Sequence, residues 1–135
     1  MSKLRLNFLN KYNTSTSLNE SVLTVLRGYA DEINEYAKEY LKTRLRISGQ
    51  ENIIDGIDLF VVATEINYEY CALEVKFYDV DSVAVIFRTL VTDQLEEKVV
   101  NISKGLTAFD KAVHDFLSST LFNEALSFLV NQILM

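Results

Sequence analysis

The fold class follows from residues 59–102, which read LFVVATEINYEYCALEVKFYDVDSVAVIFRTLVTDQLEEKVVNI. This segment is rich in β-branched and aromatic residues, and a few polar residues separate each apolar run from the next. Such short links join antiparallel strands, because parallel strands need long crossover connections. We therefore predict an antiparallel four-stranded meander with strands at residues 59–66, 70–78, 83–91 and 95–102.

A long N-terminal helix is predicted before this meander. Ser17 and Glu20 have the spacing of a capping box, and apolar residues then recur at intervals of three and four. We expect the helix to end near Arg46, because basic residues are favourable at the negative end of the helix dipole. The polar residues 10–19 are predicted to form a loop before the helix. Residues 47–58 are predicted to form a connection after it, either without regular structure or with a short turn of helix or a short strand. The tyrosines on the apolar stripe are expected in the core: Tyr29, Tyr36 and Tyr40.

The C-terminal part of the chain is also predicted to be helical. An apolar stripe indicates a helix over residues 107–117, and a broader apolar face indicates another over residues 121–135. The serine and threonine residues at 118–120 either break the helix or cap the second one. The second apolar face is wider than one contact with a sheet requires, so this helix either lies at the centre of the core or pairs with a second copy. A homodimer through the helix Leu121–Met135 is therefore a predicted assembly.

These elements predict a single α+β domain over residues 1–135, with helices packed on one face of the sheet. Residues 3–8 alternate between apolar and polar side chains, which fits either a fifth, N-terminal strand or a basic amphipathic arm. With 135 residues, 49% of them hydrophobic, the chain is long enough to bury a sizeable core. Cys71 is the only cysteine, so no internal disulfide contributes to stability.

The net charge of −6 is unevenly distributed. Residues 1–50 carry eight basic and five acidic residues, whereas residues 51–135 carry five basic and fourteen acidic residues. A net-acidic protein repels phosphate backbones, so we do not expect nucleic-acid binding. No apolar run is long enough for a membrane span and the N-terminus does not resemble a secretory signal, so we expect a cytoplasmic protein that does not bind membranes. The acidic residues either attract a basic protein partner or only provide solubility.

The sequence contains few signatures of catalysis. Its four glycines are isolated, so no glycine-rich phosphate-binding loop can be formed. His114, the only histidine, has Asp110 and Ser118 at a spacing of four residues on either side. This spacing fits a general base on a helix, but it equally fits an exposed ion pair. Cys71 continues an apolar strand pattern and is predicted to be a small buried residue rather than a nucleophile.

Asp79 and Asp81 form an Asp-x-Asp pattern, and Asp55 and Asp58 are two further carboxylates that would suit Ca²⁺ or Mg²⁺. Nothing in their spacing brings these four residues together, and aspartate is common in turns between strands. We therefore predict neither a metal site nor a cofactor.

The candidate binding surface consists of tyrosines that alternate with acidic residues around the second predicted strand. Tyrosine is frequent at the energetic centres of interfaces, and neighbouring carboxylates would select a cationic partner. Strand alternation would put Tyr70, Glu74 and Tyr78 on one face. The alternative is that the tyrosines only cover the edge of the core, with their hydroxyls in water. The predicted partner-binding residues are Glu65, Tyr68, Glu69, Tyr70, Tyr78, Asp79 and Asp81.

Three functions fit these features. The first is a small acidic protein-binding module, such as an inhibitor or immunity-type protein that neutralises a basic partner through this surface. The second is a homodimeric secretion-type chaperone that binds an extended client. The third is a small-molecule-binding or enzymatic domain with a pocket between sheet and helices, lined by His114 and Asp110. We favour the first, because the chain is acidic and lacks catalytic motifs.

Overall fold

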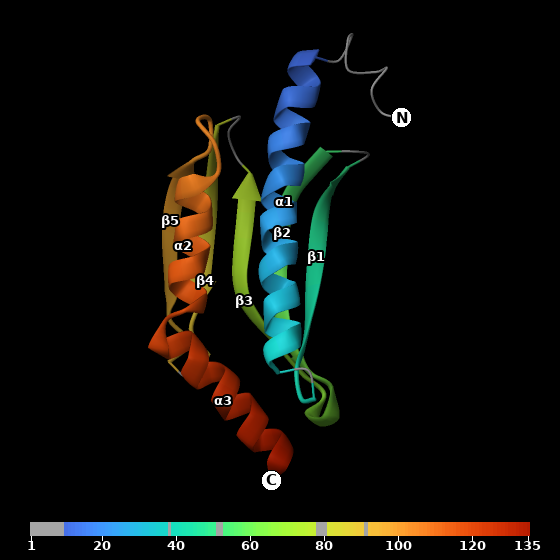
Figure 1. Cartoon of the computed structure of the whole chain (residues 1–135), viewed down its shortest axis with the longest axis vertical. Helices are drawn as coiled ribbons and strands as arrows, with labels where there is room; N and C mark the ends of the chain where they lie inside the picture. The colour runs from blue at the N-terminus through green and yellow to red at the C-terminus, as the bar shows by residue number, and fades with distance from the viewer. Residues whose placement is uncertain (1–9, 38, 51–52, 78–80, 91) are drawn as a thin grey trace.

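The computed structural model describes residues 10–37, 39–50, 53–77, 81–90 and 92–135 of the chain (Figure 1). Within these residues it contains three α-helices, a short 3-10 helix and five strands. In chain order they are α1 (Asn10–Tyr36), β1 (Lys42–Gln50), β2 (Ile53–Ala63), η2 (Thr64–Ile66), β3 (Tyr68–Phe77), β4 (Ser82–Arg88), β5 (Leu95–Asn101), α2 (Thr107–Leu117) and α3 (Thr120–Leu134).

The five strands form one antiparallel sheet in the order β1-β2-β3-β4-β5. Each strand pairs with its neighbours in the chain, which confirms the predicted α+β class and the antiparallel meander. The helices α1, α2 and α3 lie on one face of the sheet (Figure 1), as predicted. The sheet therefore has a helix side, which encloses the core, and an opposite side, which we call the open face.

The fifth strand of the sheet is β1, in a segment for which the sequence pattern predicts the end of the helix. That prediction is wrong, because α1 ends at Tyr36 and β1 pairs with β2 along its whole length. The backbone N–H of Thr43 donates a hydrogen bond to Oδ1 of Asn34 (2.8 Å), which ties the start of the strand to the end of the helix. From Lys42 to Ile47 basic and less polar residues alternate, and this period of two fits an edge strand with two different faces.

Two further boundaries differ from the prediction. α1 already begins at Asn10, so the predicted loop over residues 10–19 is wrong and Ser17 lies within the helix. Polar residues such as serine and threonine cost a helix only a fraction of a kcal/mol each, roughly 0.5, so such a segment does not by itself end a helix. β2 begins at Ile53, so much of the predicted connection over residues 47–58 is strand. The predicted strand or arm at residues 3–8 lies outside the described residues.

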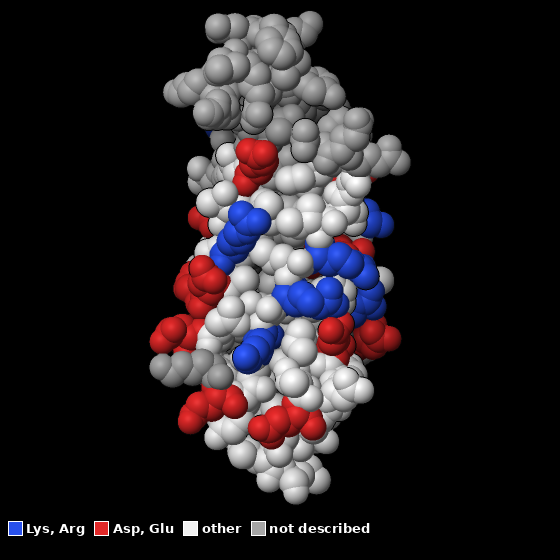
Figure 2. Space-filling model, turned by 90° about the vertical axis from the view of Figure 1, so that its right-hand side faces the viewer, with Lys and Arg blue, Asp and Glu red and all other residues white. Residues whose placement is uncertain are grey.

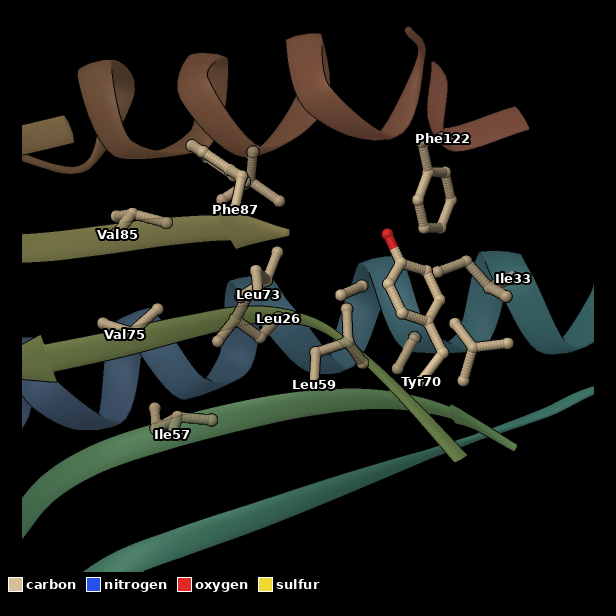
Figure 3. Close-up of a cluster of buried hydrophobic side chains, with 14 of the residues drawn as sticks. Leu26, Ile33, Ile57, Leu59, Tyr70, Leu73, Val75, Val85, Phe87 and Phe122 are labelled. Atoms are coloured by element: carbon tan, nitrogen blue, oxygen red, sulfur yellow. The ribbon is translucent and has the colours of Figure 1, made fainter. Parts of the chain in front are cut away.

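The core lies between the sheet and the three helices. α1 packs over β1 and β2, α2 packs over β5, and α3 extends from α2 towards β2 and η2. Leu26 of α1 meets Leu59 and Leu73 of the sheet in this layer (Figure 3). All three are fully buried, and burial of a leucine side chain contributes roughly 1.5–3 kcal/mol to folding.

A β-bulge in β3 changes which residues of this strand face the core. Leu59 of β2 pairs with Leu73, whereas the next residue, Phe60, pairs with Cys71. One extra residue is thus inserted in β3, and a bulge of this kind reverses the alternation of side chains beyond it. As a result, Cys71 lies on the open face and Tyr70 lies on the helix side.

Tyr70 is consequently a core residue. Its ring is 2% exposed and lies 6.4 Å from the ring of Phe122 in α3 (Figure 3). Its hydroxyl donates a hydrogen bond to the backbone carbonyl of Arg88, and burial raises the pKa of Tyr70 above its ordinary value. The prediction that Tyr70 and Glu74 share a face is wrong, because the bulge separates them. Tyr78, the third residue of that prediction, lies outside the described residues.

Ser119 separates α2 from α3, which confirms that residues 118–120 recap the helix. Its hydroxyl accepts a hydrogen bond from the backbone N–H of Phe122 (3.2 Å) and donates one to the carbonyl of Phe116 (2.6 Å). The apolar face of α3 is only partly used in the core. Phe122, Ala125, Leu126 and Leu129 are buried, whereas Leu121, Phe128 and Leu134 are exposed.

Candidate functional site

The open face of the sheet carries a network of ion pairs. Arg44 contacts Glu69 at 2.7 Å, and Arg46 contacts Asp58 at 2.6 Å. Both guanidinium groups stack on the ring of Phe60, at 4.5 and 5.2 Å from its centroid. Figure 2, which views the molecule from the β1 side, shows basic residues in the middle with acidic residues around them. Because both arginines have acidic partners, we assign these contacts a structural role.

Cys71 lies half-buried on the same face, opposite Phe60. Burial, and to a lesser extent the carboxylates of Asp58 and Glu74, raises the pKa of its thiol to about 11. The thiolate is the reactive form of cysteine, so a thiol with this pKa is almost entirely protonated and inert near neutral pH. The raised pKa fits the interpretation of Cys71 as a packing residue, but the prediction that it is buried is wrong, because the bulge places it half-buried on the open face.

We expect iodoacetamide to alkylate Cys71 far more slowly in the folded protein than in urea. At about pH 8 the raised pKa lowers the thiolate fraction on the order of 100-fold relative to an ordinary thiol. The pKa of Cys71 is higher in the folded protein than in the unfolded chain. Between about pH 9 and 11 the unfolded chain therefore releases the thiol proton more readily, and the free energy of unfolding falls as the pH rises through this range. Cys71→Ala should reduce this alkaline loss of stability. Equal alkylation rates in the folded and unfolded protein would contradict the assignment.

The excess of negative charge belongs to the helix layer. α1, α2 and α3 contain seven acidic and three basic residues, which is a net charge of −4. The five strands contain six acidic and six basic residues and are neutral overall. The three helices are therefore more negative than the five strands of the sheet.

A groove runs along this layer between α1 on one side and α2 and α3 on the other. It consists of three adjoining hollows with volumes of about 560, 210 and 340 Å³. The first and second hollows share Tyr29, Glu32 and His114, and the second and third share Tyr36 and Leu126. We call this feature the helix groove.

Three tyrosines, which were expected in the core, line the helix groove. Tyr36 is 76% exposed, so that expectation is wrong for this residue. Tyr29 and Tyr40 are half-buried, with one part packed on the core and another on the groove. Side chains of this kind have an apolar body and a polar end, which suits them to a surface that is both packed and wet.

Tyr29 connects the two walls of the helix groove. Its hydroxyl donates a hydrogen bond to Oδ1 of Asp110 in α2 at 2.5 Å. Burial, followed by the hydrogen bond and the charge of Asp110, raises the pKa of Tyr29 well above its ordinary value. The phenol therefore remains a donor throughout the physiological range, and the contact joins α1 to α2.

His114 lies on the α2 wall of the helix groove, with its side chain 62% exposed. A general base at this position would need Asp110 to orient the imidazole, but the Asp110 carboxylate binds Tyr29. The Nδ1 atom of His114 lies instead 3.8 Å from Asp115. The ammonium group of Lys111, 3.0 Å away, lowers the pKa of Asp115. His114 is therefore exposed beside an acidic residue, but the structure does not show the pair with Asp110 that the spacing of four residues allowed.

The predicted binding residues near the start of β3 point in different directions. Glu65 on η2 and Tyr68 at the beginning of β3 are both exposed. Glu69 is bound to Arg44 on the open face. Because η2 contacts α3, Glu65 and Tyr68 lie at the same end of the molecule as the C-terminal helix.

The other predicted residues do not join this pair. Tyr70 is buried in the core, and half-buried Asp81 precedes β4 at the opposite end of β3. Ten residues of strand separate the two ends by about 30 Å. Tyr78 and Asp79 lie outside the described residues. The structure thus brings together Glu65 and Tyr68 but not the full predicted set.

A pattern in the sequence could have identified the tyrosines of the helix groove as candidate binding residues. In α1 and the turn after it, the tyrosines at 29, 36 and 40 alternate with acidic residues at 31, 32, 35 and 39. The binding surface around β3 was predicted from the same combination of tyrosine and carboxylate. The helical period of these tyrosines predicted a position in the core, because the groove between α1 and α3 cannot be inferred from the sequence.

The fold and the groove define the protein as a two-layer α+β protein with an acidic, tyrosine-lined groove. Comparisons with protein-family models, with curated proteins and with solved structures give no significant match. Among the described residues, no helix combines the length and apolarity needed to cross a bilayer, and no three His, Cys, Asp or Glu side chains gather as metal ligands.

Proposed function

We propose that the protein is a binding module that holds an extended, basic segment of a partner protein in the helix groove. The observation that carries this proposal is the combination of three groove-lining tyrosines with the net charge of −4 on the helices. The proposal keeps the tyrosine-and-carboxylate chemistry inferred from the sequence and places its centre on α1 rather than β3.

Electrostatics favour a cationic occupant. Glu32 lines both the first and the second hollow, and Asp110 lies on the opposite wall. Lysine or arginine side chains of a bound segment would lie between these carboxylates. Complementary charge of this kind mainly speeds association and selects against acidic competitors.

Aromatic and apolar contacts would supply most of the affinity. Tyr36 exposes its ring beside Leu126 and Val130 of the third hollow. A tyrosine ring binds both aliphatic chains and cationic groups, and contacts of this kind dominate many interfaces.

The length of the helix groove fits a short extended peptide. From Thr24 to Tyr36, α1 advances about 18 Å at 1.5 Å per residue. An extended chain covers this distance with about five residues. The partner therefore needs only a short accessible strand or tail with alternating basic and apolar side chains.

The biological use that we favour is inhibition of a basic cytoplasmic protein, as an immunity-type protein does. A secretion-type chaperone would bind a similar extended segment of an unfolded client, so the folded or unfolded state of the bound partner distinguishes the two uses. A small-molecule or catalytic site at His114 is less well supported, because the carboxylate of Asp110, which would have to orient the imidazole, is bound to Tyr29.

We expect Tyr36→Ala to weaken binding of a basic peptide about tenfold, because it removes an exposed aromatic contact without opening the core. The probe is a fluorescent peptide with alternating lysine and leucine, and fluorescence anisotropy measures its affinity. Glu32→Gln should weaken binding less, and its effect should disappear at high salt.

Tyr68→Ala and Glu65→Gln are matched controls at the exposed end of β3. If the helix groove binds the peptide, these two variants retain the affinity of the wild type. If they weaken binding and the groove variants do not, the binding surface is the one around Glu65 and Tyr68. A peptide with glutamate in place of lysine that binds equally well would refute charge selection altogether.

A further inference from the structure

The two edges of the sheet differ in how they are protected from pairing with another strand. β1 carries Lys42, Arg44 and Arg46 on the open face, and a bulge interrupts its register between Ser48 and Gly49. Charged side chains and bulges are common features of edge strands that do not pair further. This edge of the molecule is therefore protected.

β5 has no bulge, and its charged residues are of both signs: Glu96, Glu97 and Lys98. It pairs with β4 without a register shift over its whole length and contains no proline. Its open-face residues include Leu95 and Val99, which are 58% and 61% exposed. An unbulged edge strand with exposed apolar side chains is suited to pair with another strand.

We propose that β5 pairs antiparallel with β5 of a second copy of the chain, so that the two sheets become continuous. A two-fold axis perpendicular to the sheet would relate the copies. This operation keeps the helix layers of both copies on the same side and leaves both helix grooves accessible. The proposal is independent of what the groove binds.

The sequence of β5 is complementary to itself in one register. Glu96 and Lys98 are on the helix side of the sheet, since they pair with Phe87 and Val85, which are in the core. If the two-fold axis passes through Glu97, Glu96 lies opposite Lys98 of the second copy, and Leu95 lies opposite Val99 of the second copy. Both contacts occur twice by symmetry, and cross-strand pairs of these types stabilise sheets.

The neighbouring symmetric register is less favourable. An axis through Lys98 would put the two copies of Lys98 beside each other and would place Leu95 opposite Asn101. The favoured register also contains one unfavourable contact, since the two copies of Glu97 meet on the axis. That repulsion provides a specific test, because its removal should strengthen the dimer.

A hollow beside this edge supports the same assignment. It has a volume of about 350 Å³ and lies between β5 and the helices α2 and α3, with Leu95, Phe116 and Leu121 in its lining. Leu121 is 51% exposed. The second copy would cover the open side of this hollow and the apolar atoms in it.

The first test is the dissociation constant of the dimer, measured by analytical ultracentrifugation of the full chain. We expect Glu97→Gln to lower this constant several-fold and Val99→Lys to raise it about tenfold or more. Both residues are exposed, so circular dichroism should show an unchanged fold. Phe128→Lys on α3 is the control and should leave the constant unchanged.

The second test determines the register. In a Cys71→Ser background, Glu97→Cys puts two thiols across the axis, within reach of a disulfide. Oxidation should cross-link this variant and leave Lys98→Cys monomeric on a denaturing gel. A wild type that remains monomeric at high concentration would overturn the proposal. A dimer lost in Phe128→Lys and retained in Val99→Lys would also overturn it and would place the interface on α3.

Discussion

Phe122→Ala is expected to lower the free energy of unfolding by about 3–5 kcal/mol. The side chain is 2% exposed, and its ring lies 5.3 Å from Phe116 and 6.4 Å from Tyr70. Truncation removes these aromatic contacts and leaves a cavity where α3 meets the sheet. Because Phe122 also lines the second hollow of the helix groove, the variant should bind the basic peptide more weakly as well.

Phe128→Ala is the matched control, since it makes the same truncation on the same helix. Phe128 is 47% exposed and outside the core, so we expect its effect on stability to be within about 0.5 kcal/mol. Urea denaturation followed by circular dichroism measures both values. Similar losses in the two variants would mean that α3 does not dock through Phe122.

Arg46→Met is expected to lower the free energy of unfolding by more than Arg44→Met does, because it leaves a buried carboxylate without its partner. Asp58 is the only charged residue in the buried part of the described chain, at 8% exposure. Two nitrogen atoms of Arg46, Nε and one Nη, donate hydrogen bonds to Oδ2 of Asp58 at 2.9 and 2.6 Å. Methionine retains part of the packing on Phe60 but provides no donor.

Arg44→Met provides the comparison. Arg44 lies on the same strand and stacks on the same ring, but it and its partner Glu69 are both nearly half exposed. Exposed ion pairs contribute about 0–1 kcal/mol, so this substitution should cost much less. In the double variant Arg46→Met/Asp58→Leu, most of the lost stability should return, since no buried charge remains. If the double variant is as unstable as Arg46→Met, the packing of the arginine rather than its charge stabilises this face.

The two inferred interfaces occupy different parts of the molecule. The helix groove lies between α1 and the C-terminal helices, whereas the proposed dimer contact lies along the free edge of β5. A dimer formed in this way would present two acidic grooves on one side of a continuous sheet. Such an arrangement would increase the apparent affinity for a partner that carries two basic segments.

The local patterns of the sequence were sufficient for much of the fold. The runs around Leu73, Val85 and Val99 indicated three strands close to their observed bounds, and the helix predicted over residues 107–117 coincides with α2. These elements were predictable because periods of two and of 3.6 residues are properties of a few neighbouring side chains. The same reasoning failed at Lys42–Gln50, because basic residues that would be favourable at a helix end led to a predicted helix end near Arg46, in a segment that forms β1.

The position of the candidate site was not predictable from the sequence. That tyrosines beside carboxylates bind a cationic partner stays a prediction, and Tyr70 was named among them although the bulge in β3 turns it into the core. The sequence pattern also assigned Tyr36 to the core, although this residue lines the helix groove and is exposed. In both cases the error concerned the direction of a side chain rather than its residue type.

The amino-acid sequence by itself determined the α+β class, the order of most elements and the acidic character of the chain, because each depends on composition or on neighbouring residues. Only the tertiary structure decided that β1 completes the sheet, that Tyr70 is buried and that α1 and α3 leave a groove between them. These features depend on which residues lie opposite one another across distant segments, and packing and backbone hydrogen bonding set those pairings only when the whole chain has folded.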